Sequence, residues 1–493
     1  MGTVVGTGTT GASTPAPLVA YSSAAGRWVL LATVLGSGVA FLDGTVVNVA
    51  LPAIGRDLST GFSSLQWVLD AYLLTLGALV LVGGSLGDIF GRRRMFVVGL
   101  LGFMLASAAC GLAPSAGALI AARAVQGVAA ALLVPGSLAL LSSSYAPADR
   151  ARAVGAWSAL ATLASAAGPF VGGYLVDAVS WRWVFLLNVP LVAVAVAVTV
   201  TRVPEPVAAR APGVARQHLD VTGAAVAVVG LGLVVFPLIE AHRLRPAVAL
   251  AIGLAGLLGL VAFVLVENGR AQPMLPLGLF RSRTFTACNL TTLAVYGALG
   301  GALFLLVIEL QRGLGYSALA AGAALTPVTV LLLLLSSSAG RLAGRVGPRL
   351  PMTVGPLLAA AGLALMTRVV PGASYVGAVL PGAVAFGLGM AATVAPLTAT
   401  VLGAVDDARA GVASGVNNAV ARVAGLIAVA VLPLVAGLSS SRQLSPLAFT
   451  AGFHRAMWVA AAVCVAGGVV SYVGVPRRAP VAVAAAETPA GPR

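Results

Sequence analysis

The chain has 493 residues, of which 59% are hydrophobic and only 9% are charged, and its mean hydropathy is +1.02. This composition excludes a water-soluble globular protein and indicates a polytopic membrane protein. The formal net charge is +15, and all 29 basic residues are arginine. Because lysine is absent, a Walker A phosphate loop and a pyridoxal Schiff base are excluded.

Long apolar stretches follow one another along the chain. A bilayer core about 30 Å thick needs about 20 apolar residues per helix. Windows of that length predict an all-α membrane protein with fourteen spans, at residues 28–50, 66–86, 95–112, 117–141, 153–175, 183–202, 220–239, 247–266, 286–308, 318–339, 350–368, 376–402, 412–437 and 454–475. Residues 1–27 lack the basic start of a cleavable signal, so we expect a disordered tail there, a retained first span, and a second tail over 476–493.

The arginines are distributed unevenly between the two sides of the predicted membrane. Arg123 and Arg422 fall inside spans, 19 others lie on the side of the termini, and 8 lie on the opposite side, namely Arg56, Arg182, Arg243, Arg245, Arg312, Arg368, Arg442 and Arg455. Positive residues favour the cytoplasmic side, and an even number of spans returns the chain to the side where it began. The sequence therefore predicts that both termini are cytoplasmic and that the high charge reflects topology, with no nucleic-acid partner.

Asp43 is an acidic residue within the first predicted span. An ionisable side chain at the centre of a membrane costs about 2.5 kcal/mol or more, so it needs a functional or structural partner. The functional interpretation is transport; the structural one is a hydrogen bond to Asn48 or to a facing helix. In the fourth span, the structural interpretation of Arg123 is a buried charge paired with a backbone carbonyl or a carboxylate. Gln126 lies three residues on, on the same helix face, where it lines the cavity or bridges helices.

The connection between the second and third spans combines glycines with charges. Gly84, Gly87 and Gly91 permit a tight turn and close helix approach, and Asp88 can pair with an arginine or with a helix start, while Arg92, Arg93 and Arg94 mark the cytoplasmic side. In the fifth span, Gly168, Pro169, Gly172 and Gly173 favour a bend or tight packing.

These motifs together resemble those of the major facilitator superfamily. The Gly84–Arg94 segment is similar to its loop signature, Arg123, Gln126 and Gly127 to its R-x-x-Q-G motif, and Gly168–Gly173 to the G-P-x-x-G-G motif of antiporters. Trp181-Arg182-Trp183-Val184-Phe185 with Asn188 and Pro190 resembles a signature of the fourteen-helix drug:proton antiporter branch, as does the run around Asp43. The resemblance implies proton coupling through Asp43 and Arg123, and a loop that secures one conformation.

The resemblance also implies the organisation of the chain. We expect a six-helix bundle over 28–202, two linker helices over 220–266, and a second six-helix bundle over 286–475, with the transport site between the bundles. A weaker copy of the loop motif, Gly340 to Gly347, stands at the corresponding place in the second half, with Gly344 where the family has an aspartate.

The remaining polar and aromatic residues of the spans give only guesses for a substrate site: Asp70, Tyr72, Gln126, Trp157, Asn289 and Tyr296. Asp70 and Glu309 lie near the predicted outer interface, where we expect Asp70 to be solvated. Arg422 with Asn417 and Asn418 forms a polar face of the thirteenth span. The three cysteines lie in spans at unrelated spacings and are interpreted as buried apolar residues.

The function predicted from these features is proton-coupled efflux of amphipathic or cationic drugs across the bacterial cytoplasmic membrane, by a monomer that is not an enzyme and needs no cofactor or metal. A dedicated exporter of one metabolite or self-made antibiotic is the alternative. A membrane-bound enzyme or a sensor is a different class, and it lacks support because no paired catalytic carboxylates, metal ligands or sizeable soluble domain can be found in the sequence.

Overall fold

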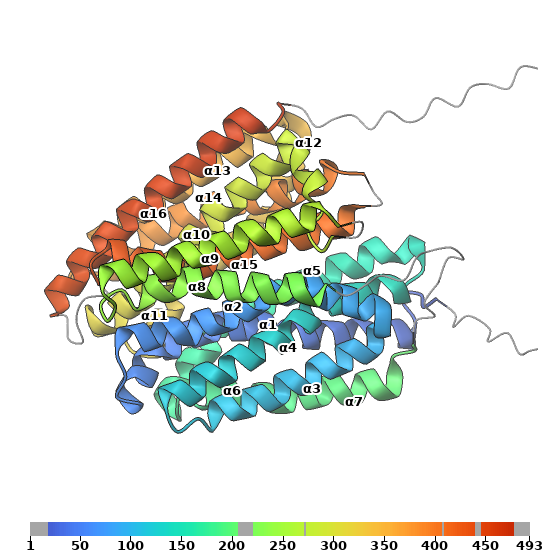
Figure 1. Cartoon of the computed structure of the whole chain (residues 1–493), viewed down its shortest axis with the longest axis horizontal. Coiled ribbons are helices and arrows are strands. Elements are labelled where there is room, and N and C mark those ends of the chain that lie inside the picture. Colours follow the sequence, from blue (N-terminus) through green and yellow to red (C-terminus); the bar gives the residue numbers. More distant parts are fainter. Residues whose placement is uncertain (1–17, 206–219, 271–272, 407–408, 439–444, 478–493) are drawn as a thin grey trace, which may run out of the picture.

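The structure, a computed structural model, describes residues 18–205, 220–270, 273–406, 409–438 and 445–477. Fourteen helices in this part are long and apolar enough to cross a membrane, and each overlaps one predicted span. The count is therefore confirmed, and the chain is an all-helical, multi-pass membrane protein (Figure 1).

Two bundles and a hairpin make up the fold (Figure 1). The N-terminal bundle consists of α1 (Ala24–Asp57), α2 (Phe62–Phe90), α3 (Arg92–Gly111), α4 (Ala116–Ser144), α5 (Pro147–Ala178), α6 (Trp183–Leu186) and α7 (Asn188–Arg202). The linker hairpin consists of α8 (Val221–Ile239) and α9 (Pro246–Asn268). The C-terminal bundle follows a short η1 (Leu277–Arg281) and consists of α10 (Arg283–Arg312), α11 (Ala318–Ala323), α12 (Thr326–Val346), α13 (Arg349–Leu365), η2 (Met366–Arg368), η3 (Tyr375–Val379), α14 (Leu380–Gly403), α15 (Ala410–Val435) and α16 (Pro446–Gly474).

Local sequence explains where many helices begin. The side chains of Ser23, Ser115, Ser282, Ser317 and Ser445 each accept a hydrogen bond from a backbone N–H of the first turn. This satisfies a donor that has no partner inside the helix, which matters most where water is scarce.

The helices run further than the hydrophobic windows indicated, and the first begins earlier than expected. α1 starts at Ala24, and Val19 exchanges backbone hydrogen bonds with the end of α4 and the segment that follows it, donating to Ser144 and accepting from Ala146. Residues 18–27 are therefore ordered, which corrects the expected tail over 1–27 in that part. Residues 1–17 and 478–493, on which the rest of the expected tails fall, lie outside the described residues.

The two bundles meet on the side of the membrane opposite to the start of α1 and the end of α16. We call this opposite side the far side and the other the terminal side. On the far side Gln311 of α10 donates to the Val49 carbonyl of α1 at 2.9 Å, and Asp177 of α5 accepts from the backbone N–H groups of Ala318 and Leu319. Nearer the terminal side, Leu163 of α5 and Leu334 of α12 remain exposed. The bundles are thus held together at the far side.

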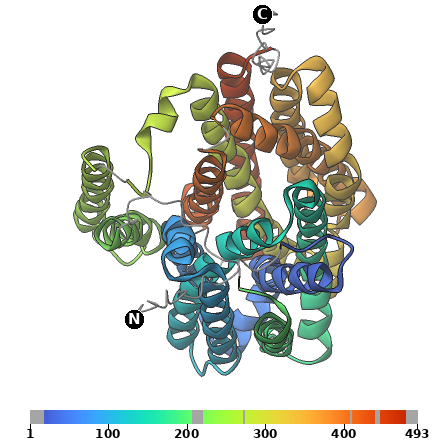
Figure 2. The ribbon, with the colours of Figure 1, turned by 90° about the vertical axis from the view of Figure 1, so that its right-hand side faces the viewer.

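The linker hairpin lies against the seam of the two bundles. Viewed along the helices in Figure 2, α8 and α9 stand to one side, next to α2. α8 packs on α2 of the N-terminal bundle and on α15 of the C-terminal bundle. Trp67 of α2 donates a hydrogen bond at 3.1 Å to Glu240, which lies at the far-side end of α8. One helix of the hairpin therefore touches both bundles.

Candidate functional site

Asp43 lies at the centre of a polar network inside the N-terminal bundle. Its side chain is wholly buried, and its Oδ2 accepts from Nη1 of Arg123 at 2.5 Å. Its Oδ1 accepts from Nε2 of Gln126 at 3.0 Å and from Nδ2 of Asn188 at 3.2 Å. Asn48, the partner considered from the sequence, instead donates to carbonyls of its own helix. The partners of Asp43 therefore come from facing helices.

Arg123 is held from three directions. Its Nε donates to the Val68 carbonyl of α2 at 3.0 Å, and its Nη1 donates to Gln126 Oε1 at 2.7 Å as well as to Asp43. The guanidinium stacks over the Tyr72 ring, 4.2 Å from its centroid. A cation over an aromatic face gains electrostatic attraction, and more so where water is excluded. This arrangement fixes the charge of Arg123 at a buried position that otherwise disfavours it.

Three residues that were not among the predicted site residues join the network. Asn188 is the first residue of α7, and Ser107 of α3 accepts from Gln126 at 2.8 Å and from Asn188 at 3.3 Å. Cys110 also reaches the network, since its thiol donates to Gln126 Oε1 at 3.6 Å. Asn188 belonged to a quoted motif and was available as a signal, whereas a single serine in an apolar span gives none.

The buried ion pair of Asp43 and Arg123 stands at the centre of this network. Asp43 is its only acid, and the charges of Asp43 and Arg123 compensate each other. Removing one partner of a buried ion pair leaves an uncompensated charge and costs about 3–5 kcal/mol. The packing of α1, α3, α4 and α7 around the pair therefore depends on the presence of both partners.

Asp70 does not lie where the sequence suggested. It is wholly buried in α2, and neither carboxylate oxygen has a hydrogen-bond partner among the described residues. The expected solvated position is therefore wrong, because α15 covers this face of α2: Gln66, one turn earlier, donates to the Val429 carbonyl at 2.7 Å. A carboxyl group in such surroundings is stable only when it is neutral or when it gains a partner in another conformation.

The other guessed substrate residues are dispersed. Trp157 of α5 donates to Ser37 of α1 at 2.8 Å, and Asn289 of α10 accepts from Asn417 of α15 at 3.2 Å. Tyr296 is half-buried on α10. Arg422 of α15 lies with its guanidinium 5.7 Å from the Phe41 ring centroid of α1, across the bundle interface. The structure brings Tyr72 and Gln126 to Asp43, and leaves Trp157, Asn289 and Tyr296 elsewhere.

Glu309 forms a second buried acidic position, near the far-side end of α10. Its Oε1 accepts from the Thr450 hydroxyl of α16 at 2.6 Å, and its Oε2 has no partner among the described residues. It is wholly buried, although the sequence suggested the outer interface. It does not contact the network of Asp43.

Gly91 alone separates α2 from α3, and the charged residues at the end of α2 and the start of α3 pair within the N-terminal bundle. Asp88 binds Arg92 at 2.9 Å, and Arg92 also donates to the Ala139 carbonyl of α4. Arg93 donates to two carbonyls at the end of α7. Gly91 has φ of +100°, a conformation that favours glycine at this turn. The β-carbon of a larger residue at Gly84 or Gly87 would make only ordinary contacts, so close approach does not require those two glycines.

The glycine motif of α5 sets two close helix contacts. A β-carbon at Gly172 would lie 2.4 Å from Val46 Cγ2 of α1, and one at Gly173 would lie 2.4 Å from the Leu319 α-carbon of the C-terminal bundle. Pro169 contacts Gly322 of α11 in the same region, and Gly168 faces Thr45 of α1. This motif therefore packs α5 against α1 and against the other bundle, at the place where the bundles are closed.

The motif that begins at Trp181 and Arg182 binds the far-side end of α1. Asp57 accepts from Trp181 Nε1 at 2.9 Å and from Arg182 Nη1 at 2.5 Å. These contacts tie the far-side end of α1 to the connection between α5 and α6, about 21 Å along the helix axis from Asp43.

In the described part of the chain, twelve spanning helices form two six-helix bundles, two more form the linker hairpin, and one bundle holds a buried ion pair; this is the architecture of a secondary membrane transporter. The comparison with known families makes this specific: residues 33–429 match the Major Facilitator Superfamily, and the chain belongs to it. Members of this family are transporters and not enzymes.

Curated relatives and solved structures agree with this assignment. The chain is 36% identical to the probable actinorhodin transporter of Streptomyces coelicolor, over 82% of this chain and 72% of the relative. It is 34% identical to the multidrug resistance protein Stp of Mycobacterium tuberculosis, over 85% and 77%, and 36% identical to a puromycin resistance protein of Streptomyces alboniger, over 85% and 84%. The crystal structure of a bacterial homologue of the lysosomal transporter Spinster, in an inward-facing and unoccupied conformation, superposes with a TM-score of 0.65 at 18% identity, covering 92% of this chain and 97% of that one.

Proposed function

We propose that this protein exports amphipathic or cationic organic compounds in exchange for protons. The observation that carries the proposal is the buried contact of Asp43 with Arg123, Gln126 and Asn188. A membrane carboxylate that can lose its partner when it is protonated provides a means of linking proton movement to conformation. The names of the relatives, which include multidrug and antibiotic resistance proteins, support export as the direction.

The two bundles, residues 28–202 and 286–475, act in this proposal as bodies that rock against each other around the central site. The contacts of Asp177 and Gln311 at the far side support an inward-facing conformation here. We place the protein in the cytoplasmic membrane as a monomer with both termini cytoplasmic, on the basis of the arginine distribution.

The proton reaches Asp43 from outside when the far side is open. Protonation leaves the Arg123 charge with Gln126, the Val68 carbonyl and the rings of Tyr72 and Phe185, which destabilises the packing of α4 on α1. Release of the proton to the cytoplasm restores the ion pair of the present structure. A driving force of about 150 mV supplies about 3.5 kcal/mol per proton, which sustains a gradient of roughly a few hundredfold.

The experiment is a resistance and accumulation assay. A bacterial strain lacking its own pumps, expressing this protein, is tested against a panel of cationic dyes and antibiotics. We expect lower accumulation of several compounds and loss of the effect with a protonophore. Unchanged accumulation of every compound, or efflux that persists without a proton gradient, would contradict the proposal.

A dedicated exporter of one compound is the second candidate, because relatives carry the names of single antibiotics, such as actinorhodin and puromycin. The same panel separates the two functions: efflux restricted to one chemical class favours the dedicated exporter.

A further inference from the structure

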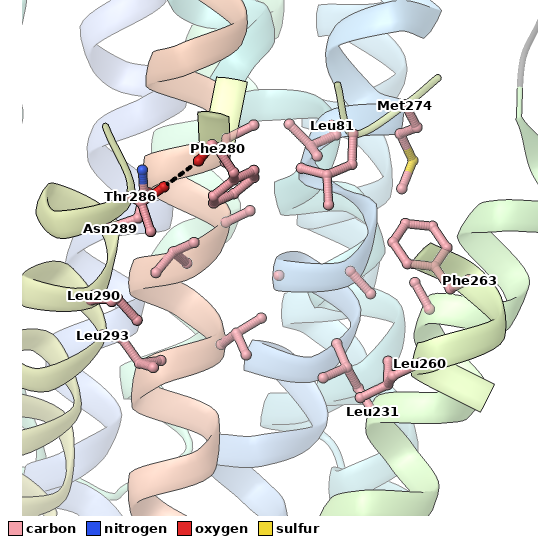
Figure 3. A pocket seen from close by; sticks show the side chains of 18 residues that line it. Leu81, Leu231, Leu260, Phe263, Met274, Phe280, Thr286, Asn289, Leu290 and Leu293 are labelled. Carbon is pink, nitrogen blue, oxygen red and sulfur yellow. Dashed lines mark hydrogen bonds between the residues drawn. The ribbon is translucent and has the colours of Figure 1, made fainter. Parts of the chain in front are cut away.

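A cavity of about 340 Å³ lies outside the Asp43 network, between the linker hairpin and both bundles. Figure 3 shows α10 on one side of it, α8 and α9 on the other, and α2 and α15 between them. Met274, Leu275 and Phe280 of the connection from α9 to α10 complete its lining. It is therefore bounded by all three parts of the fold.

The lining is apolar, and its two polar side chains are already bonded. The Thr286 hydroxyl donates to the Phe280 carbonyl at 2.7 Å, as the dashed line in Figure 3 marks. Asn289 donates to the Phe285 carbonyl at 2.9 Å and accepts from Asn417. The lining thus has no charge for a cationic compound and no free polar group for water, and apolar cavities of this kind stay dry.

The surface of α10 that lines the cavity lies in the half of the span nearer the terminal side. α10 is largely buried, yet Leu290 and Leu293, which line the cavity, are 47% and 38% exposed. Thr286 to Leu293 lie roughly 5 to 15 Å along the helix axis from Arg283, the first residue of α10, so this exposure falls in the leaflet of the terminal side. An empty space there would deprive its lining of dispersion contacts, and lipid tails are the apolar groups most abundant beside it.

A positively charged residue follows the lining at the terminal-side end of the cavity. Arg281 directly follows Phe280 of the lining, is exposed, and has no ion pair among the described residues. Arg270, by contrast, is paired with Asp220 and Glu267. Exposed arginine at the membrane surface attracts anionic head groups.

We propose that this cavity is a binding site for an anionic phospholipid, with one acyl chain between the hairpin and the two bundles and the phosphate near Arg281. In this proposal the lipid's acyl chain contacts Leu81 of the N-terminal bundle, Leu293 and Val420 of the C-terminal bundle, and Leu231 of the hairpin. Because the bundles move relative to each other during transport, the lipid binds one conformation better than another and stabilises the present one.

The test uses the full-length protein in proteoliposomes with a phosphatidylglycerol that carries a photoreactive group on its acyl chain. We expect labelling of cavity-lining peptides from α8, α10 or α15. Ala227→Phe and Ala419→Phe, which fill the cavity from two different helices, abolish this labelling. Val229→Phe is the matched control, since Val229 is on α8 and 58% exposed outside the lining, and it leaves the labelling unchanged.

A second readout addresses the head group. Arg281→Gln removes the preference of the labelled site for phosphatidylglycerol over phosphatidylcholine. Labelling by the photoreactive group on the acyl chain persists in this variant. Thermal unfolding confirms that each variant is folded. Absence of cavity labelling in the wild-type protein, or equal labelling in the wild type and both filled variants, would overturn the proposal. Labelling requires no transport, so this result is independent of the outcome of the efflux assay.

Discussion

Replacing Asp177 by asparagine perturbs the contact that closes the two bundles at the far side. The carboxylate of Asp177, at the end of α5, accepts from the Ala318 N–H at 3.0 Å and from the Leu319 N–H at 2.8 Å. An asparagine amide offers one oxygen and turns its NH₂ group towards the second N–H, so one charge-assisted bond is lost. Asp177→Asn therefore weakens the closed far side without removing any apolar contact.

The size of the effect follows from the bond that is lost. A hydrogen bond to a charged group contributes about 1.5–3 kcal/mol. Because every 1.4 kcal/mol is about tenfold in an equilibrium constant, the ratio of far-side-open to far-side-closed molecules should rise by roughly 10- to 100-fold.

The assay measures distances between spin labels on the two bundles. Val179 and Val370 are exposed at the far side, on the N-terminal and C-terminal bundle respectively, and Val179→Cys with Val370→Cys provides the label sites. The native cysteines are buried, so they can be replaced or left unlabelled. Asp177→Asn is expected to increase the population with a long distance.

Asp149→Asn is the matched control. Asp149 also accepts from a backbone N–H, that of Tyr21 at 2.9 Å, but both residues belong to the N-terminal bundle. This variant should leave the distance distribution unchanged. An equal shift in both variants, or no shift in Asp177→Asn, would refute the reasoning that this contact controls the far side.

The remaining predictions concern topology, the loop and helix packing. Both termini should be cytoplasmic, and a reporter fused at Arg493 that is active only outside the cytoplasm would contradict the arginine argument. Asp88→Asn or Arg92→Ala should lower turnover with near-normal expression, because the pair positions the loop after α2; unchanged efflux kinetics in both would reduce the motif to a topology signal. Gly172→Val should destabilise the fold by about 1–3 kcal/mol or more, because the added β-carbon would collide with α1. Gly155→Val on the same helix is the control, since a β-carbon there meets open space. Equal unfolding temperatures of the two variants would show that the close contact is not required.

The sequence predicted the membrane architecture well because each span is specified by the length of its own apolar run. A span needs only its own residues to be apolar, so fourteen spans could be counted without knowing any contact. The ends were less predictable. α1 begins at Ala24 and continues to Asp57 because Ser23 caps its first turn and Asp57 is held by Trp181 and Arg182, and these contacts lie outside a hydropathy window.

The Asp43 network was predictable only in part. Asp43, Arg123 and Gln126 stood out because polar groups in a membrane need partners. Ser107 could not be found in this way, because a hydroxyl in a membrane helix can bond to its own backbone and needs no neighbour. The burial of Asp70 depends on α15, which is more than 300 positions away in the chain, so its distance from a span end was misleading.

The central claim, that Asp43 couples proton movement to export, is tested most directly by substrate-induced proton release from proteoliposomes. Asp43→Asn keeps the shape and can still accept from Gln126 and Asn188, but it cannot titrate. Asp57→Asn, on the same helix, is the control, because the side-chain hydrogen bonds of Asp57 within the described parts of the chain go to Trp181 and Arg182 and not to the Asp43 network. We predict no proton release in folded Asp43→Asn and near-normal release in Asp57→Asn; wild-type proton release in Asp43→Asn would contradict the account and direct attention to Asp70 or Glu309.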